Sequence, residues 1–228
     1  MDLSGIMQVY PPINLYNERV RKLAKEFGPV WVRVSGTWAT KTYYDLDGHT
    51  NGQIPEGYQS VLTKDQWINL LEFVKAVGAK LLVSVNNCEG LHKADEPWHP
   101  GQAEQLFRFS KEYGVPVEAA EFMNEPNMLA FSGAPRGYTA EHYRRDQDLF
   151  FKWLHENYPE VLRVGPCTVA AEMGPEAGMD TSGLGGMFGD NVSTEGLMEP
   201  TSERIDVYSY HYYTGISDRL MSVMPQMH

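Results

Sequence analysis

The chain has 228 residues, a hydrophobic content of 42% and a net charge of −11, which suit one globular core. The acidic balance, without any basic run, argues against nucleic acid and anionic membrane surfaces as partners. No apolar stretch is long enough to span a membrane, and no signal-peptide pattern begins the sequence. The only cysteines, Cys88 and Cys167, form no disulfide framework, so they are expected to be two thiols or at most one disulfide.

The first half of the chain predicts two helices and two strands. Apolar residues recur at helical spacing after Asn17, which can cap a helix that Gly28 ends. A second helix has a capping box at Thr63 and Gln66, and Gly78 stops it. The elements expected here are a helix at 17–27, a strand at 30–34, a polar loop from 38 to about 62, a helix at 64–77 and a strand at 80–85.

The second half continues the alternation of helices and strands. A Gly-Val-Pro turn at Gly114 introduces a strand that begins at Val117, and Pro126 must end this strand because proline cannot donate to the next ladder position. The elements expected here are a helix at 102–113, the strand from 117, a helix at 139–157, a weaker strand at 162–168, a glycine-rich and methionine-rich loop at 174–197, and a strand at 204–213.

Strands that alternate with helices of this length predict βαβ units and a parallel sheet. No strand is followed by a Gly-x-Gly-x-x-Gly turn, which argues against a dinucleotide-binding fold. Polar residues instead follow the strands, which favours an α/β fold of the (β/α)8 TIM-barrel class. These residues are Thr37, Asn86, Asn124, Glu125, Thr168 and the tyrosines near 212. Only five strands are found, so residues 1–228 are expected to form a single partial catalytic barrel domain, with about strands 2 to 6 of the barrel and without the first and the last two.

The polar pair Asn124 and Glu125 at the end of an apolar strand is the strongest candidate for chemistry. Glycoside hydrolysis needs two carboxyl groups across the scissile bond, and Glu125 in a water-poor cleft could be the proton donor. The structural alternative is that Glu125 caps the next helix and Asn124 forms a turn. Strict alternation would send the two side chains to opposite faces, so we expect the strand to bulge or break before Pro126.

The segment Glu121–Asn127 is similar to the Asn-Glu-Pro strand of clan A retaining glycosidases. More specifically, the chain resembles glycoside hydrolase family 79, the heparanases and related β-glucuronidases. The similarity covers roughly residues 15 to 213, with further matches in the expected order at 32–37, 57–60, 82–86, 162–166 and 205–213.

The resemblance implies that Glu125 is the catalytic acid/base and that Asn124 binds the sugar 2-hydroxyl. It implies substrate contacts for Thr37 and Asn86, and a tyrosine on the last strand that tunes the nucleophile. Alternation groups Tyr208, Tyr210 and Tyr212 on one face, so Tyr212 is the first choice, Tyr210 the second and His211 the third. The expected nucleophile, a glutamate on the seventh strand, has no counterpart before His228, so this chain alone is predicted to be inactive.

The expected substrate is a carbohydrate that contains uronic acid. The basic residue that heparanases carry after Asn-Glu-Pro is absent, so a simple β-glucuronide is preferred to a highly sulfated glycan. The alternatives are another clan A glycosidase, such as a xylosidase or glucanase, and a sugar-binding protein without catalysis. The histidines form no zinc-binding pattern, so neither a metal ion nor another cofactor is expected. Members of the resembled family are usually secreted or periplasmic, but the sequence leaves the location open.

Overall fold

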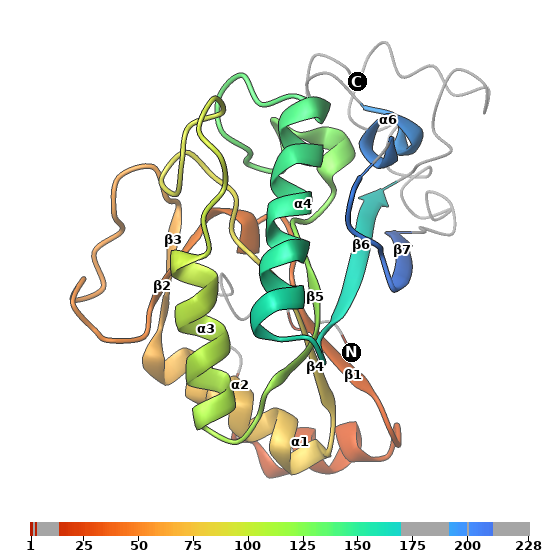
Figure 1. The fold of residues 1–228 in the computed structure, drawn as a ribbon. Helices are drawn as coiled ribbons and strands as arrows, with labels where there is room; N and C mark the ends of the chain where they lie inside the picture. Colours follow the sequence, from red (N-terminus) through yellow and green to blue (C-terminus); the bar gives the residue numbers. More distant parts are fainter. Residues whose placement is uncertain (2, 4–13, 170–191, 200, 212–228) are drawn as a thin grey trace, which may run out of the picture.

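The computed structural model describes residues 1, 3, 14–169, 192–199 and 201–211 (Figure 1). Its main sheet has five parallel strands in the order β1-β4-β5-β6-β7. The strands are β1 (Trp31–Val34), β4 (Lys80–Ser84), β5 (Val117–Glu121), β6 (Leu162–Val169) and β7 (Val207–His211). The curled sheet with alternating helices is a half-barrel, which confirms the prediction of an incomplete TIM-barrel fold.

One helix precedes the half-barrel's first strand, and the others lie between its successive strands. They are α1 (Glu18–Lys25), α2 (Lys64–Val77), α3 (Gly101–Glu112), α4 (Ala140–Asn157) and α6 (Thr194–Met198). In Figure 1, α3 and α4 lie in front of the sheet, and Phe107 of α3 contacts Trp153 of α4 with ring centroids 5.2 Å apart. The buried faces of α2, α3 and α4 therefore cover the outer face of the sheet, and the opposite face lines its hollow.

The helix ends follow the sequence signals. The Asn17 side chain accepts the backbone N–H groups of the first turn of α1, and Thr63 with Gln66 forms the predicted capping box of α2. Gly78 ends α2 in the left-handed conformation, at φ 70°, which glycine adopts without a steric penalty. The predicted boundaries of these helices are therefore confirmed within a few residues.

The apolar stripe of α1 is not part of the described core. Leu23 and Phe27 are 58% and 74% exposed, and Ala24 is the only buried residue of the helix. By contrast, Trp67 of α2 is fully buried and donates its indole N–H to Ser110 of α3. The core is centred on α2, α3 and α4 and is rich in aromatic rings, so much of the aromatic content has a structural role.

Two short strands in the predicted polar loop correct the sequence interpretation. β2 (Thr42–Asp45) and β3 (Ser60–Thr63) pair in parallel as a separate two-stranded sheet, preceded by a 3-10 turn, η2 (Ala39–Lys41). Both strands are short runs of β-branched or aromatic residues close to several glycines, so the sequence pattern did not identify them as strands. Met1 and Leu3 also exchange backbone hydrogen bonds with Trp31 and Arg33 of β1, in a part of the chain for which the sequence predicted no element.

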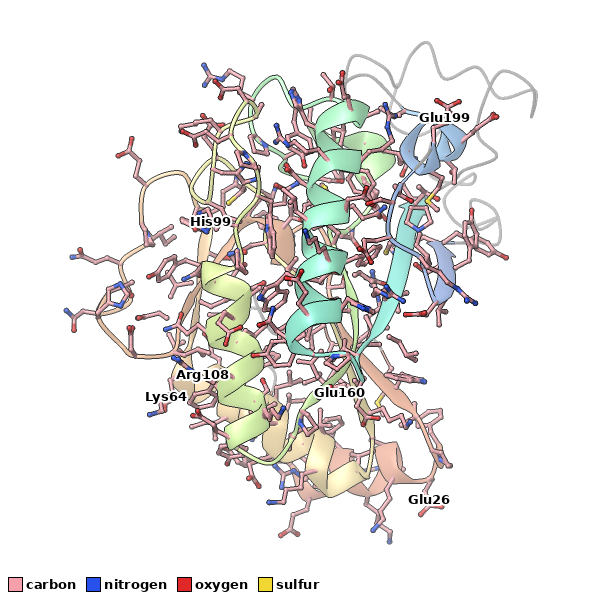
Figure 2. All side chains as sticks on the ribbon, viewed as in Figure 1. Glu26, Lys64, His99, Arg108, Glu160 and Glu199 are labelled. Atoms are coloured by element: carbon pink, nitrogen blue, oxygen red, sulfur yellow. The ribbon has the colours of Figure 1, made fainter. Side chains whose placement is uncertain are left out.

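Many charged side chains of the described residues lie at the surface, whereas Asp45, Glu121 and Asp146 are buried. Figure 2 shows Lys64 and Arg108 on the outside of α2 and α3, and Glu160 in the turn after α4. No helix among the described residues has both the length and the apolar composition that crossing a membrane requires.

Candidate active site

Glu125 lies where the chain leaves β5. The strand ends at Glu121, and Glu125 has φ 50° and ψ 53°, a left-handed conformation that non-glycine residues adopt at a cost of about 1–3 kcal/mol. The next residues form a 3-10 turn, η3 (Pro126–Met128), and the Glu125 N–H donates to the Cys167 carbonyl at 3.1 Å. The predicted break before Pro126 is therefore confirmed, and it allows Asn124 and Glu125 to face the same cavity.

The cavity occupies the hollow of the half-barrel and has a volume of about 940 Å³. Apolar residues such as Trp31, Leu82 and Val164 are part of its lining. Polar residues line the end at which the strands terminate: Arg33, Thr37, Glu121, Asn124, Glu125, Ser209 and His211. The polar residues thus gather at the carboxyl ends of the strands, the edge at which barrel enzymes place their active sites.

His211 holds one oxygen of the Glu125 carboxyl group. Its Nδ1 lies 2.7 Å from Glu125 Oε1, and its Nε2 lies 3.1 Å from Nη2 of Arg33. Arginine can only donate, so where Nη2 gives a hydrogen to His211, Nε2 accepts it and the proton on Nδ1 is donated to Glu125. No described residue hydrogen-bonds Glu125 Oε2, so this oxygen is available for a ligand.

Arg33 also organises the base of the site. Its guanidinium contacts both carboxylate oxygens of Glu121, with the shortest distance 3.0 Å, although only 3% of the Glu121 side chain is exposed. Ser84 and Ser35 donate to the same carboxylate at 2.8 Å and 3.2 Å. A buried carboxylate must be paired to remain charged, and this one is paired with three donors.

The side-chain oxygen of Asn124 is fixed by the same group of residues. Asn124 Oδ1 accepts from Arg33 at 3.0 Å, and the Ser35 hydroxyl oxygen lies 3.3 Å from it. The amide nitrogen is therefore left to donate, beside Glu125, into the cavity. Asn124 can thus bind a hydroxyl group of a ligand while Glu125 acts on it.

Cys167 lies behind the site as a buried thiol with φ 59°. Its sulfur is 3.0 Å from Arg33 Nη2 and 3.3 Å from His211 Nε2, and burial raises the pKa of the thiol well above its usual range. The second cysteine, Cys88, is also a buried free thiol. Both cysteines are therefore separate thiols, as the composition suggested.

The remaining predicted substrate residues differ in position. Thr37 borders the cavity, whereas Asn86 is fully buried and donates its amide to the Thr42 carbonyl at 3.0 Å, which fixes the start of β2. Tyr210 borders the cavity, but it is 58% exposed and its ring contacts that of Tyr208. Tyr212 lies outside the described residues. The structure thus brings His211, our third choice on this strand, to Glu125.

Sequence reasoning missed Arg33, Glu121, Ser35, Ser84 and Cys167. Arg33 and Glu121 carried a signal, because a charged residue inside a strand that is otherwise apolar must find a partner. The two serines and Cys167 gave no such signal. Their role depends on contacts between strands that are distant in sequence.

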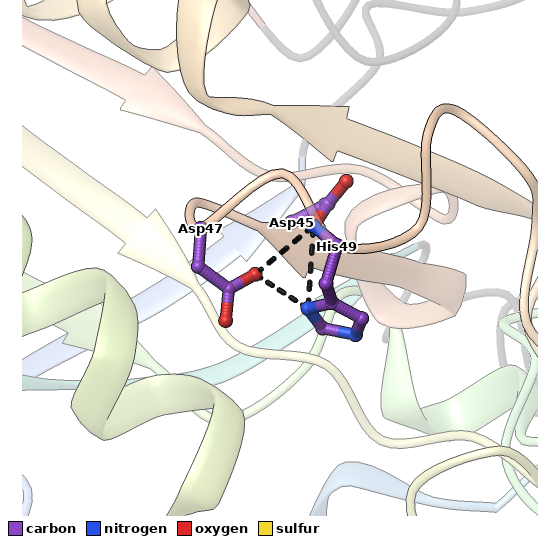
Figure 3. A group of neighbouring side chains, drawn as sticks. All are labelled: Asp45, Asp47 and His49. Carbon is purple, nitrogen blue, oxygen red and sulfur yellow. Dashed lines mark hydrogen bonds and ion pairs between the residues drawn. The ribbon is translucent and has the colours of Figure 1, made fainter.

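One group among the described residues has a donor set that could hold a metal ion, namely Asp45, Asp47 and His49 after β2 (Figure 3). His49 Nδ1 lies 2.5 Å from Asp47, which raises the pKa of the imidazole, and Asp45 accepts the Thr50 hydroxyl at 2.5 Å. These bonds account for the geometry of the loop. They supply no separate evidence for an ion, and the cluster does not border the cavity of Glu125.

Comparison with solved structures supports the fold. The chain aligns with an α-L-arabinofuranosidase from Thermotoga maritima at 17% identity and a TM-score of 0.55, over 88% of this chain and 40% of that one. A family 51 α-L-arabinofuranosidase from Thermotoga petrophila gives 18% identity and a TM-score of 0.55, over 94% and 44%. The chain therefore spans less than half the length of these enzymes, and the likeness shows the fold alone.

Sequence comparison identifies the family. A comparison with curated proteins found no match. The model of the glycosyl hydrolase family 79 N-terminal domain, however, matches residues 7–217, which is nearly the whole chain. With its half-barrel and the Asn124–Glu125 pair at a strand end, the chain belongs to the glycosyl hydrolase family 79 N-terminal domains.

Proposed function

We propose that the chain forms the acid/base side of a retaining glycoside hydrolase whose substrates are β-glucuronides. The observation that carries the proposal is the arrangement of Glu125. One carboxyl oxygen is held by His211 while the other is open to the cavity, and Asn124 lies beside it. Membership of family 79 supports the reaction class.

In the proposed reaction, Glu125 gives the proton on its Oε2 to the glycosidic oxygen as the bond to the anomeric carbon breaks. A nucleophilic carboxylate attacks that carbon from the opposite side and forms a covalent glycosyl intermediate. Glu125 then takes a proton from water, which attacks the intermediate and releases the sugar. Asn124 binds the 2-hydroxyl, and His211 keeps the carboxyl group of Glu125 in one orientation.

The nucleophile is expected outside this chain. Among the described residues, the other carboxylate that lines the cavity is Glu121, and its environment argues against that role. Arg33, Ser35 and Ser84 donate to it, so its lone pairs are occupied, and the residue is only 2% exposed. A nucleophile needs a carboxylate oxygen free to approach the anomeric carbon.

The assay for the proposal is hydrolysis of 4-nitrophenyl β-glucuronide by the protein that contains the complete barrel. Glu125→Gln should lower kcat by about 10²–10⁴-fold, the usual contribution of a general acid. Glu118→Gln is the matched control, because Glu118 is on the same strand but pairs with Lys80 at the surface. Activity of Glu125→Gln within a few-fold of wild type would refute the assignment.

Two other functions remain as alternatives. The first is a glycosidase of other sugar specificity, such as a xylosidase or glucanase, because family 79 membership supports the reaction class and not the sugar. Within the described part of the chain, Glu125 is the one cavity carboxyl group with an unoccupied oxygen, and this also suits a sugar-binding protein without catalysis. Hydrolysis rates for a panel of aryl glycosides distinguish a β-glucuronidase from the first alternative. Binding of glucuronate in isothermal titration, without any turnover, would favour the second.

A further inference from the structure

Trp38 and Lys41 form an aromatic and cationic pair just beyond the cavity. Trp38 is 40% exposed, and the Lys41 ammonium nitrogen lies 4.7 Å from the centroid of its ring. Lys41 itself is half-buried. The pair therefore presents an indole surface and a positive charge side by side.

The pair lies at the same edge of the sheet as Glu125, because loops from three strand ends meet there. Thr37, the residue before Trp38, borders the cavity, and the N–H of Asn87 after β4 donates to the Thr40 carbonyl. The aliphatic stem of Lys41 packs on Gly133, in the loop after β5. The neighbouring Ser132 hydroxyl donates to the Glu125 carbonyl at 2.7 Å, which links this loop to the acid/base residue.

The positive charge of Lys41 has no anionic partner in the part of the chain that the structure describes. The ion pairs found there involve other lysines, such as Lys80 with Glu118 and Lys93 with Glu89. The nearby Cys88 thiol is neutral, since burial raises its pKa to about 11, and burial lowers the pKa of Lys41. A desolvated ammonium without a counter-ion is stabilised when a ligand supplies one.

We propose that Trp38 and Lys41 form a subsite for an acidic sugar unit, which they bind by stacking and by an ion pair. The exposed indole surface packs against the C–H face of the sugar ring, and the ammonium binds a carboxylate or sulfate on it. The subsite specifies the substrate class of the proposed hydrolase, and it rests on that function for its biological meaning. It also gives the site a second cation besides Arg33, which is paired with Glu121, although no basic residue directly follows Asn124-Glu125-Pro126.

The test uses two disaccharides that differ in one group, cellobiose and cellobiouronic acid, with isothermal titration of a Glu125→Gln background that cannot turn them over. A charged hydrogen bond of about 1.5–3 kcal/mol corresponds to at least a tenfold preference for the acid. Lys41→Gln should abolish this preference and leave the Kd of cellobiose unchanged, whereas Lys41→Arg should retain most of it. Trp38→Ala should weaken binding of both disaccharides.

Lys64→Gln is the matched control, because Lys64 also lies over an aromatic ring, that of Phe109, but on the surface of α2. A third probe, cellobiose 6′-sulfate, shows whether the subsite takes a sulfate as well as a carboxylate. The proposal is overturned if the Glu125→Gln background shows no preference for an acidic probe, or if Lys41→Gln weakens acidic and neutral probes equally. A Lys41-dependent preference without hydrolysis in the wild type would refute the proposed function and leave the subsite standing.

Discussion

The pairing of Arg33 with Glu121 makes a quantitative prediction. Arg33→Met keeps most of the aliphatic stem but removes the charge that lies 3.0 Å from a carboxylate whose side chain is 3% exposed. Loss of one partner of a buried pair costs about 3–5 kcal/mol, since the other charge stays buried. Two serine hydroxyls continue to bind Glu121. We therefore expect the lower end of that range, a decrease of about 3 kcal/mol in the free energy of unfolding.

The assay is urea unfolding, followed by far-ultraviolet circular dichroism. Lys80→Met is the control, because the Lys80–Glu118 pair is exposed and should contribute only about 0–1 kcal/mol. Adding Glu121→Gln to Arg33→Met should recover much of the lost stability, because the neutral amide has no buried charge to compensate. The reasoning is refuted if Arg33→Met costs no more than Lys80→Met, or if Glu121→Gln makes the double variant less stable still.

Three further predictions concern other parts of the structure. His211→Ala should lower kcat for the aryl glucuronide about 10-fold or more, because the Glu125 carboxyl group would no longer be held in one orientation. An unchanged kcat would contradict the positioning role of His211. At pH 9 the Cys88 thiol, with its pKa near 11, should react with iodoacetamide about 100-fold more slowly than free cysteine, and urea should abolish the difference. Since the unfolded thiol ionises at lower pH than the folded one, stability should also fall as the pH rises from 9 to 11. Gly57→Ala should lower the free energy of urea unfolding by about 3 kcal/mol, because the new Cβ would lie 2.5 Å from the Gly90 backbone. Gly48→Ala, also at positive φ but in open space, should lower it by only about 1 kcal/mol. Equal losses for the two variants would contradict the argument.

The main helices and strands were predictable because their signals are local. Capping residues, helical spacing and glycine stops marked α1 and α2, and the apolar runs marked the strands of the main sheet. β2 and β3 were missed because each has four residues and together they enclose a glycine-rich loop. The exposure of the apolar stripe of α1 could not be predicted, because it depends on what packs against that helix.

The site was predictable only in part, for a geometric reason. The Asn124-Glu125-Pro126 sequence predicted both the polar pair and the break in the strand. Alternation placed His211 and Tyr210 on opposite faces of the strand, but both border the cavity, and only the folded structure shows that His211 is the one that reaches Glu125. The partnership of Arg33 with Glu121 spans 88 residues, so no local pattern could reveal it.

The central claim, that Glu125 donates a proton to the leaving group, is tested most directly by the leaving-group dependence of kcat/KM in Glu125→Gln. A series of aryl β-glucuronides from phenyl to 2,4-dinitrophenyl varies the need for that proton while the sugar stays the same. We predict a loss of about 10²–10⁴-fold for phenyl glucuronide, which shrinks towards wild-type activity for the dinitrophenyl compound. A loss of the same size across the whole series would contradict the claim, because it would mean that Glu125 does not act on the leaving group.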